Sequence, residues 1–326
     1  MELKKELTFI FSQFNVRKTF KDFKTFSSGH INDTYLILTE EKPHFVLQKI
    51  NGSIFKLAKE VIENKAKATA FLIENNCKTL QYVKSLEQKD YVKDVKDNYW
   101  NLCYYIEDSQ TFTQVKSTKI AFEAGKATGD FLNDMKEFKE DLVDVLPNFH
   151  NMTFRYSQFD DALKTASENR KKTAEKLIDF CHSKREEMTI LDRAILNKEL
   201  PLRVIHNDTK ISNILFDNND KAICLIDLDT VMNGIIHFDF GDALRTTCST
   251  ASEDEKNVDL INFNFDYFKN YSDGFLNATK NQLTKNELKY LPLSPKIITF
   301  IMGIRFLTDY LNNDIYYINN TKLQLK

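Results

Sequence analysis

The chain contains 326 residues, which exceeds what one hydrophobic core usually supports, so its length predicts two lobes or domains. Its net charge of −2 and its pI near 6.3 offer no positive field for binding nucleic acid or an anionic membrane. Eight glycines and five prolines, together with 26 phenylalanines, indicate compact regular structure rather than linkers or low-complexity tails.

Neither a targeting segment nor a membrane span is expected. Residues 1–14 hold only a short apolar stretch, broken by Ser12 and Gln13, and no small-residue cleavage site follows it. No run approaches the roughly 18 apolar residues of a transmembrane helix. The five cysteines are odd in number and lack CxxC spacing, which is typical of buried thiols in a reducing compartment. We therefore expect a cytoplasmic protein.

Short strands dominate the first third of the chain. Alternating polar and apolar residues predict a strand over 20–26, and two further strand-like runs follow at 34–38 and 45–50. A helical stretch comes next, and a second hairpin is predicted from strands at 92–95 and 99–106. This order of hairpin, third strand and helix is that of the small lobe of kinases, in which a turn covers the nucleotide phosphates.

Two places in this region are candidates for holding nucleotide phosphates. The first turn lacks a GxGxxG pattern, but the backbone amides of Ser28 and Gly29 can cup phosphate oxygens. Lys49, in the string VLQK, has the spacing of the third-strand lysine that contacts phosphates. Glu60 and Glu63 of the following helix are both available to pair with this lysine, and we favour Glu63.

Residues 104–107, after the second hairpin, are the candidate hinge between the two lobes. Backbone groups at Tyr105 and Ile106 are in the position where kinases bind adenine. The aromatic side chains there are otherwise ordinary core residues, so this assignment depends on the order of the strands.

A string that begins at Val204, VIHNDTKISNILFDNNDKAICLIDLD, carries the chemistry. His206, Asp208 and Asn213 fit the pattern HxDxxxxN of a kinase catalytic loop, and Asp227 lies on the next apolar strand. Phosphoryl transfer needs one carboxylate to accept the hydroxyl proton, and an Asn oxygen with a second carboxylate to hold Mg²⁺. Asp208 is therefore the candidate base, and Asn213 and Asp227 are the candidate metal ligands of an ATP-dependent kinase.

The same string predicts a hairpin. Apolar runs lie on both sides of a strong turn signal at 217–220. A hairpin folded about this turn places Lys210 opposite Asp227. Asn213 and Asp227 then lie near the same open end, offset by three residues or roughly 10 Å of strand, so that they can converge on one metal site.

The rest of the chain is largely helical. Apolar residues at helical spacing predict core-facing helices within 163–195 and over 297–311. Arg305 lies at the border of the apolar face of the second helix, which suits a half-buried side chain with one end in a cleft. Helix geometry alone favours a different role, an i,i+4 ion pair with Asp309 worth about 0.3 to 0.5 kcal/mol.

Five strings together carry a family resemblance: SSGHINDTYLI, HNDTKISNILFD, IDLDTVMNG, HFDFGDALR and IRFLTDYLNNDIYY. The chain resembles the aminoglycoside phosphotransferase and choline kinase superfamily, and within it the N-acetylhexosamine 1-kinases, over about residues 27–317. The resemblance implies an α+β, bilobal protein-kinase-like fold. A small, mainly antiparallel β lobe would span 1–106, and a larger helical lobe at 107–326 would carry the catalytic hairpin and bind the substrate.

The resemblance also implies an activity and individual roles. The activity is ATP- and Mg²⁺-dependent phosphorylation of the anomeric 1-hydroxyl of N-acetylglucosamine or N-acetylgalactosamine. Asp239 would support the catalytic loop. The implied sugar contacts are His30, Asp208, Asp229, Arg305 and Tyr317, with Tyr316 as the alternative to Tyr317. Two departures from the family pattern are Asn233, where Pro is commoner, and Lys49, where related sugar kinases often have Arg.

Other functions remain open at this point. A kinase of choline, ethanolamine, homoserine or an aminoglycoside would share the catalytic residues, and a cationic acceptor would need acidic or aromatic neighbours such as Asp242 and the Tyr-rich tail. A non-catalytic, pseudokinase-like binding module is disfavoured because Asp208, Asn213, Asp227 and Lys49 are all present. A protein kinase is disfavoured because the APE string is missing and no activation segment is evident between Asp227 and Asp239.

Overall fold

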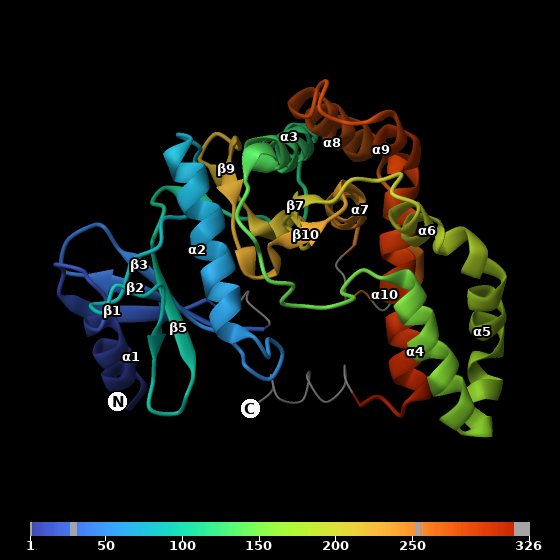
Figure 1. The fold of residues 1–326 in the computed structure, drawn as a ribbon, viewed down its shortest axis with the longest axis horizontal. Helices are drawn as coiled ribbons and strands as arrows, with labels where there is room; N and C mark the ends of the chain where they lie inside the picture. Colours follow the sequence, from blue (N-terminus) through green and yellow to red (C-terminus); the bar gives the residue numbers. More distant parts are fainter. Residues whose placement is uncertain (1, 27–30, 252–254, 256, 316–326) are drawn as a thin grey trace.

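The computed structural model describes residues 2–26, 31–251, 255 and 257–315, which form two lobes (Figure 1). A small lobe of strands lies on one side of helix α2 (Ala58–Glu74), and a larger, mainly helical lobe lies on the other. Each lobe has its own apolar core, and a third cluster joins Val61 of α2 to Val145 and Met232 of the larger lobe. The predicted α+β, bilobal architecture is confirmed.

The small lobe is built on a five-stranded antiparallel sheet with the strand order β1-β2-β3-β5-β4. Every strand predicted from the alternation of residues is present, although the fourth is only two residues long. The strands are β1 (Phe20–Thr25), β2 (Asp33–Thr39), β3 (Phe45–Lys49), β4 (Val92–Lys93) and β5 (Tyr99–Tyr104).

Helices cover both faces of this sheet. Helix α1 (Glu2–Ser12), for which the sequence analysis predicted nothing, buries Leu7 and Phe11 against Phe45 and Trp100 on the outer face. Helix α2 lies over the opposite face, next to the larger lobe. Burial of apolar surface on each face stabilises this small lobe by about 25 cal/mol for every Å² that is removed from water.

The larger lobe contains eight α-helices among the described residues; the periodic apolar runs correctly predicted α5, α6 and α10, and only the last three residues of α4 fall in the predicted range. These eight helices are α3 (Thr118–Asp134), α4 (Met152–Thr165), α5 (Glu168–Met188), α6 (Ile190–Leu196), α7 (Ile236–Thr247), α8 (Phe265–Ala278), α9 (Lys285–Tyr290) and α10 (Ser294–Leu311). Short 3-10 turns lie between them: η1 (Met135–Glu137), η2 (Ile211–Asn213), η3 (Leu228–Thr230), η4 (Val258–Leu260) and η5 (Leu291–Leu293).

Two short sheets lie inside this helical frame. β7 (Arg203–Ile205) pairs with β10 (Met232–Gly234), and β6 (Ser109–Gln110) pairs with the hairpin of β8 (Ile214–Asp217) and β9 (Ala222–Leu225). All of these pairs are antiparallel. They place the loop after β7 and the loop after β9 side by side.

The hairpin is present, but its predicted register is wrong by two residues. Ile214 pairs with Leu225, and the N–H of Ile226 donates to the carbonyl of Asn213 at 2.8 Å. The strands shift register at a bulge between Leu215 and Phe216. Asp227 therefore follows the residue opposite Asn213 directly, and the two candidate metal ligands are closer in register than predicted.

One helical segment among the described residues, Lys285–Leu311, has a length and a mean hydropathy (1.3) that would suit a membrane span. The sequence analysis had expected no such run. Its apolar side chains at Ile297, Ile301 and Ile304 are each 1 % exposed and belong to the core of the larger lobe. Packing of α10 against α4, α5 and α7 thus accounts for the apolar composition of this segment.

Helices α3 and α8 approach each other closely because each has a glycine at the contact. A Cβ atom on Gly125 would collide with the carbonyl oxygen of Tyr271, and a Cβ atom on Gly274 would collide with that of Phe122. Both obstacles are backbone atoms, so the helices themselves would have to move apart.

We expect Gly125→Ala to destabilise the protein by more than about 2 kcal/mol, because overpacking against backbone cannot be relieved by a side-chain rotation. Gly303→Ala in α10 is the matched control, since nothing lies within 4 Å of the added Cβ atom. It should stabilise the protein by about 0.5 to 1 kcal/mol. Urea unfolding followed by circular dichroism measures both, and equal effects of the two substitutions would contradict the close approach of α3 and α8.

Candidate active site

A buried carboxylate holds the loop that follows β7. Asp239, in the first turn of α7, accepts hydrogen bonds from the backbone N–H groups of His206 (2.9 Å) and Asn207 (2.6 Å). The hydroxyl of Thr209 donates to the carbonyl oxygen of Asp239 at 2.6 Å. Burial, only partly offset by His206 and the two N–H donors, raises the pKa of Asp239 to about 6. The structure supports the predicted role of Asp239 as the residue that orders this loop.

His206 connects the same loop to the end of β9. Its Nδ1 accepts from the N–H of Asp208 at 3.2 Å, which leaves the proton on Nε2 to donate to the carbonyl of Ile226 at 2.8 Å. Ile226 immediately precedes Asp227. The imidazole therefore sets the spacing between the two segments that carry Asp208 and Asp227.

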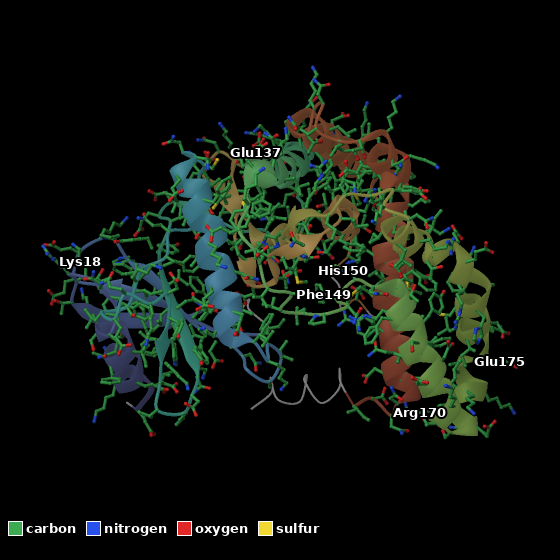
Figure 2. All side chains as sticks on the ribbon, viewed as in Figure 1. Lys18, Glu137, Phe149, His150, Arg170 and Glu175 are labelled. Carbon is green, nitrogen blue, oxygen red and sulfur yellow. The ribbon has the colours of Figure 1, made fainter. Side chains whose placement is uncertain are left out.

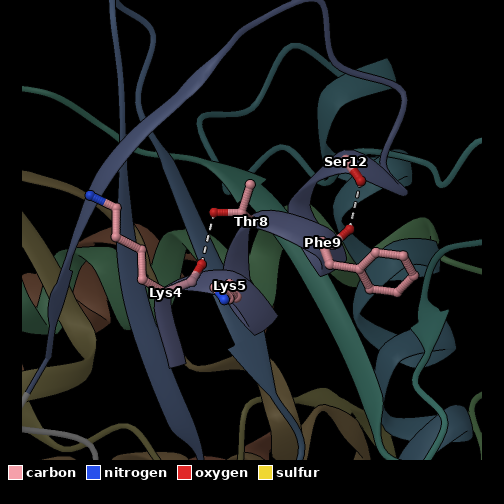
Figure 3. Close-up of a pocket in the computed structure, with 5 residues that line it drawn as sticks. All are labelled: Lys4, Lys5, Thr8, Phe9 and Ser12. Carbon is pink, nitrogen blue, oxygen red and sulfur yellow. Dashed lines mark hydrogen bonds between the residues drawn. The ribbon is translucent and has the colours of Figure 1, made fainter. Parts of the chain in front are cut away.

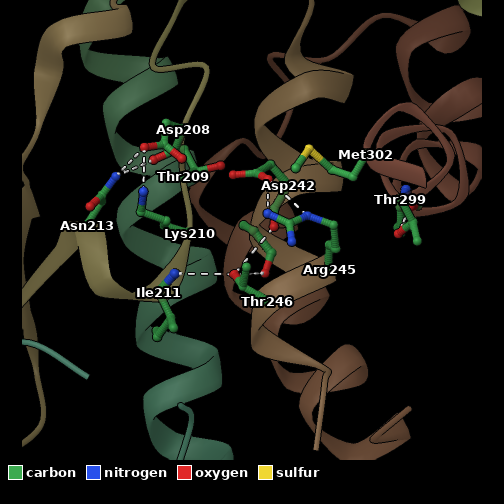
Figure 4. A network of polar contacts seen from close by, with 12 residues as sticks. Asp208, Thr209, Lys210, Ile211, Asn213, Asp242, Arg245, Thr246, Thr299 and Met302 are labelled. Carbon is green, nitrogen blue, oxygen red and sulfur yellow. Dashed lines mark hydrogen bonds and ion pairs between the residues drawn. The ribbon is translucent and has the colours of Figure 1, made fainter. Parts of the chain in front are cut away.

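The Asp208 carboxylate belongs to a polar network (Figure 4). Its Oδ2 contacts the Nζ of Lys210 at 2.9 Å and accepts from the side-chain amide of Asn213 at 2.9 Å. Burial opposes ionisation of this carboxyl, but the Lys210 ammonium and the amide outweigh it, so the pKa of Asp208 is lowered from its ordinary value. The side chain is still 27 % exposed. Asp208 is thus an ionised carboxylate that a substrate can reach.

The second carboxylate, Asp227, is in the left-handed backbone region with φ 60° and ψ 52°. Burial, followed by the charges of Asp229 and Asp208, raises the pKa of Asp227 to about 7. Crowded carboxylates of this kind are stabilised by a bound divalent cation.

The donor set fits Mg²⁺ in the manner of enzymes that bind it together with a substrate. The side-chain amide nitrogen of Asn213 donates hydrogen bonds to Asp208, so the Oδ1 atom of Asn213 is the one available to bind a metal. No group of three or more His, Cys, Asp or Glu side chains able to hold a metal occurs in the described part of the chain. Mg²⁺ commonly takes one or two protein oxygens and completes its shell with phosphate oxygens and water, so Asn213 and Asp227 suffice.

The predicted lysine of the third strand is on the wrong face of the sheet. Lys49 shares the outer face with Leu47, lies 5.4 Å from the ring centroid of Trp100, and pairs with Asp33 at 2.5 Å. The predicted partner, Glu63, pairs instead with Lys59, one turn away on α2, at 3.2 Å. The predicted ion pair between Lys49 and Glu63 is therefore not formed.

At the predicted hinge, two backbone groups already have partners within the protein. The N–H of Tyr105 donates to the carbonyl of His44 at 3.0 Å, and the carbonyl of Ile106 accepts from the hydroxyl of Ser109 at 2.6 Å. An adenine ring at this segment would have to use the neighbouring backbone groups.

The predicted sugar contacts have different outcomes. Asp229 is 4 % exposed, and both of its oxygens are held, one by Lys65 at 2.5 Å and the other by Asn32. It is an internal ion-pair partner in this structure and does not present its carboxylate to a ligand. Arg305 contacts the sulfur of Met302 at 3.6 Å, and the alternative ion pair with Asp309 is not formed. Ser28, Gly29, His30, Tyr316 and Tyr317 lie outside the described residues.

Sequence reasoning gave no catalytic role to three polar groups near Asp208, although it named Asp242 as a possible neighbour of a cationic acceptor. Lys210 pairs with the candidate base itself, and burial, which opposes protonation, is outweighed by Asp208 and Asp227, so the pKa of Lys210 is raised. Asp242 and Arg245, one turn apart on α7, form an ion pair at 2.8 Å in the same network. The position of Lys210 between the two motif residues was the signal that could have identified it.

His150 supports the catalytic loop through a contact with its backbone. Figure 2 shows it beside Phe149 on the segment that leads into α4. Its Nε2 lies 3.0 Å from the carbonyl oxygen of Asn207, and the rings of Phe149 and Phe238 lie 4.3 and 4.9 Å away. Burial lowers the pKa of His150 to about 4, so the ring is neutral at pH 7 and donates to that carbonyl. A cavity of about 420 Å³ opens next to it.

A second cavity, of about 410 Å³, lies on the outer side of α1 (Figure 3). Its lining is Lys4, Lys5, Thr8, Phe9 and Ser12. None of these residues belongs to the network around Asp208, so this cavity is separate from the candidate active site.

The Asp239→Asn variant should misplace the catalytic loop, because one acceptor oxygen is replaced by a donor that faces an N–H group. A displacement of about 1 Å is enough to lower kcat roughly 100-fold. Asp239 has a folded pKa above its ordinary value, so it contributes stability at low pH that is lost as the pH rises through about 6. Wild type should therefore gain up to about 3 kcal/mol over the variant between pH 6 and pH 4. A pH-independent difference in urea unfolding, or an unchanged kcat, would contradict this role.

Comparisons with known proteins agree with this geometry. Residues 22–268 match the model of the phosphotransferase enzyme family, called APH. Spectinomycin phosphotransferase, solved with ADP and spectinomycin, is 11 % identical with a TM-score of 0.60 over 98 % of this chain and 92 % of its own. A microcompartment-associated aminopropanol kinase is 14 % identical (TM-score 0.62, 94 % of each chain), and choline kinase from Cryptosporidium parvum is 14 % identical (TM-score 0.59, 98 % and 96 %). These likenesses show a shared fold, and the family match shows that the chain belongs to the phosphotransferase enzyme family.

Proposed function

We propose that the protein is an ATP-dependent kinase that phosphorylates the anomeric 1-hydroxyl of N-acetylhexosamines, N-acetylglucosamine or N-acetylgalactosamine. The observation that carries the kinase assignment is the convergence of Asp208, Lys210, Asn213 and Asp227 at the open end of one hairpin. The division of labour between lobes follows the same reasoning: residues 1–106 hold the nucleotide, and 107–326 hold the acceptor and the catalytic loop.

Each residue of this group has a defined task. Asp208 accepts a hydrogen bond from the 1-hydroxyl and takes its proton as the oxygen attacks the γ-phosphorus in line. Lys210 keeps Asp208 ionised and adds positive charge beside the transferred group. Asn213 and Asp227 would hold Mg²⁺, which neutralises charge on the nucleotide phosphates. Because a hemiacetal hydroxyl is more acidic than an ordinary alcohol, orientation should matter more than base strength.

Ion pairing on the acceptor side favours a neutral polyol over a cation. Asp208 is paired with Lys210 and Asp242 with Arg245, so both carboxylates already have a cationic partner. A cationic acceptor would need acidic or aromatic groups that are not already compensated. Asp242 is 5 % exposed; its Oδ1 is bonded to Arg245, and its buried Oδ2 has no hydrogen-bond partner among the described residues.

The amino-sugar assignment rests on the strings GHINDTY, HNDTK and IDLDTVM, because the fold is shared with kinases of several acceptors. Solved neighbours include proteins named for spectinomycin, aminopropanol and choline. A kinase of such an alcohol is the alternative. ATP as the donor is supported by neighbours solved with ADP and with AMP-PNP.

A panel of acceptors tests the assignment. Purified protein with ATP and Mg²⁺ should release ADP with N-acetylglucosamine or N-acetylgalactosamine and much less with choline, ethanolamine, homoserine, aminopropanol or spectinomycin. Phosphorus NMR should identify the product as a sugar 1-phosphate. Arg305→Met should raise the KM for the sugar about tenfold or more, because a hydrogen bond to a charged group is worth about 1.5 to 3 kcal/mol. Turnover of a cationic alcohol alone would overturn the sugar assignment.

Asp208→Asn should reduce kcat by about 100- to 10,000-fold, the range that a positioned general base supplies. The affinity for ATP should change little, since Asp208 is placed at the acceptor hydroxyl and not at the nucleotide. Asp220→Asn is the matched control: it removes a carboxylate from the turn of the same hairpin, where φ is 59° and Asn is tolerated. Turnover like that of wild type in the Asp208 variant would remove this residue from its role.

A further inference from the structure

A lysine of helix α2 is buried where the two lobes meet. The side chain of Lys65 is 1 % exposed, and its Nζ contacts Oε1 of Gln48 at 2.9 Å and Oδ1 of Asp229 at 2.5 Å. The ring centroid of Tyr82 lies 5.7 Å from the same atom. An ammonium group loses its hydration at such a site, and these contacts compensate for that loss.

The alternation of side chains along β3 explains why this lysine comes from a helix. Phe45, Leu47 and Lys49 face α1, so Val46 and Gln48 face α2 and the larger lobe. Gln48 therefore occupies the position on the inner face of the sheet that the sequence analysis had given to Lys49. The amide cannot carry charge, and the cation is supplied by Lys65 instead. The sequence analysis had expected a lysine on the strand and a glutamate on the helix. In the structure the strand carries the uncharged Gln48, and the helix carries the lysine.

The partner of Lys65 belongs to the segment that carries the candidate metal ligand. Asp229 is in η3, which begins directly after Asp227. The neighbouring α2 residue, Asn64, donates to the carbonyl of Val231 at 3.1 Å, so α2 holds this segment at two points. The second oxygen of Asp229 accepts from Asn32, the residue next to the described end of the β1–β2 turn.

We propose that Lys65 is the positioning residue that locks the Asp227 segment to the small lobe, in the structural role expected of Lys49. Through Asp229, the ion pair fixes the backbone at 227–229 and with it the direction of the Asp227 carboxylate. Through Gln48, the same ammonium ties that segment to the sheet. This inference rests on the proposed function for its consequence, Mg²⁺–nucleotide binding, but the ion pair itself is a property of the protein without ligands.

An exchange of the two side chains is the sharpest test. Lys65→Gln leaves Asp229 buried without its cation and should lower the melting temperature of the ligand-free protein by several degrees. It should also weaken binding of ATP with Mg²⁺ about tenfold, measured by calorimetry, with a smaller effect on ATP alone. The double variant Gln48→Lys/Lys65→Gln returns the cation from the strand, at unchanged net charge. We expect it to recover more than half of both losses, a coupling of the size seen for residues in direct contact.

Two further variants separate positioning from folding. Lys65→Met/Asp229→Asn removes both charges while the Asn32 contact remains, so the ligand-free protein should melt near the wild-type temperature. Its Mg²⁺–ATP affinity should still fall about tenfold and its sugar KM should not change. Lys49→Gln, on the other face of the same strand, should leave the affinity for Mg²⁺–ATP unchanged.

The possible results distinguish failure of the Lys65 proposal from failure of the proposed function. A Lys49→Gln variant that loses Mg²⁺–ATP affinity, a Lys65→Gln variant that keeps both wild-type properties, or a double exchange no better than Lys65→Gln alone would each overturn the proposal. Wild-type protein that binds no ATP would overturn the proposed function only. In that case the melting temperatures of the single and exchanged variants still decide whether Lys65 locks the segment.

Discussion

The active-site region depends on one constraint: several acidic groups must be held close together in a place with little water. Asp208, Asp227, Asp229, Asp239 and Asp242 all belong to two loops and the start of one helix. Burial alone would protonate such a set. Every one of these carboxylates except Asp227 has a partner that opposes this effect. Lys210, Lys65 and Arg245 supply charge to three of them, and backbone N–H groups serve Asp239. Asp227 is left with the raised pKa that a bound cation would correct.

Contacts from both lobes hold the two loops of the candidate active site in position. The hairpin of β8 and β9 sets the distance between the two loops, His206 joins them, and Asp239 and His150 fix the first loop from opposite sides. The small lobe reaches the second loop mainly through α2. The apolar core of each lobe provides the rigid support that these polar contacts need, because short polar loops cannot hold a geometry without it.

Much of this could be predicted from the sequence, and the exceptions have physical reasons. The strands of the small lobe, the hairpin of β8 and β9 and helices α2, α5, α6 and α10 follow local patterns, so they were identified correctly, whereas α3, α7, α8 and α9 were not predicted. Lys49 was misassigned because alternation shows that it shares a face with Leu47 but not which face borders the larger lobe. That required α1, which was not predicted. The Lys65–Asp229 pair spans 164 residues, and no local pattern reports a contact of that range. One residue of the register error came from the turn, which is centred on Asn219, and the other came from a bulge, which adds a residue to one strand without a signal in the residue types.

Two residues of the catalytic loops, Asn207 and Asp227, have positive φ angles of 67° and 60°. Only Gly, Asn and Asp adopt this conformation readily, so the shape of the main chain restricts these positions before any chemistry does. An alanine introduced at 227 would change the backbone preference as well as delete the carboxylate, whereas asparagine changes the charge alone. Evolutionary or engineered substitutions at these two positions are therefore restricted to Gly, Asn and Asp. Of these three residue types, Asp at position 227 is the one that also attracts a metal ion.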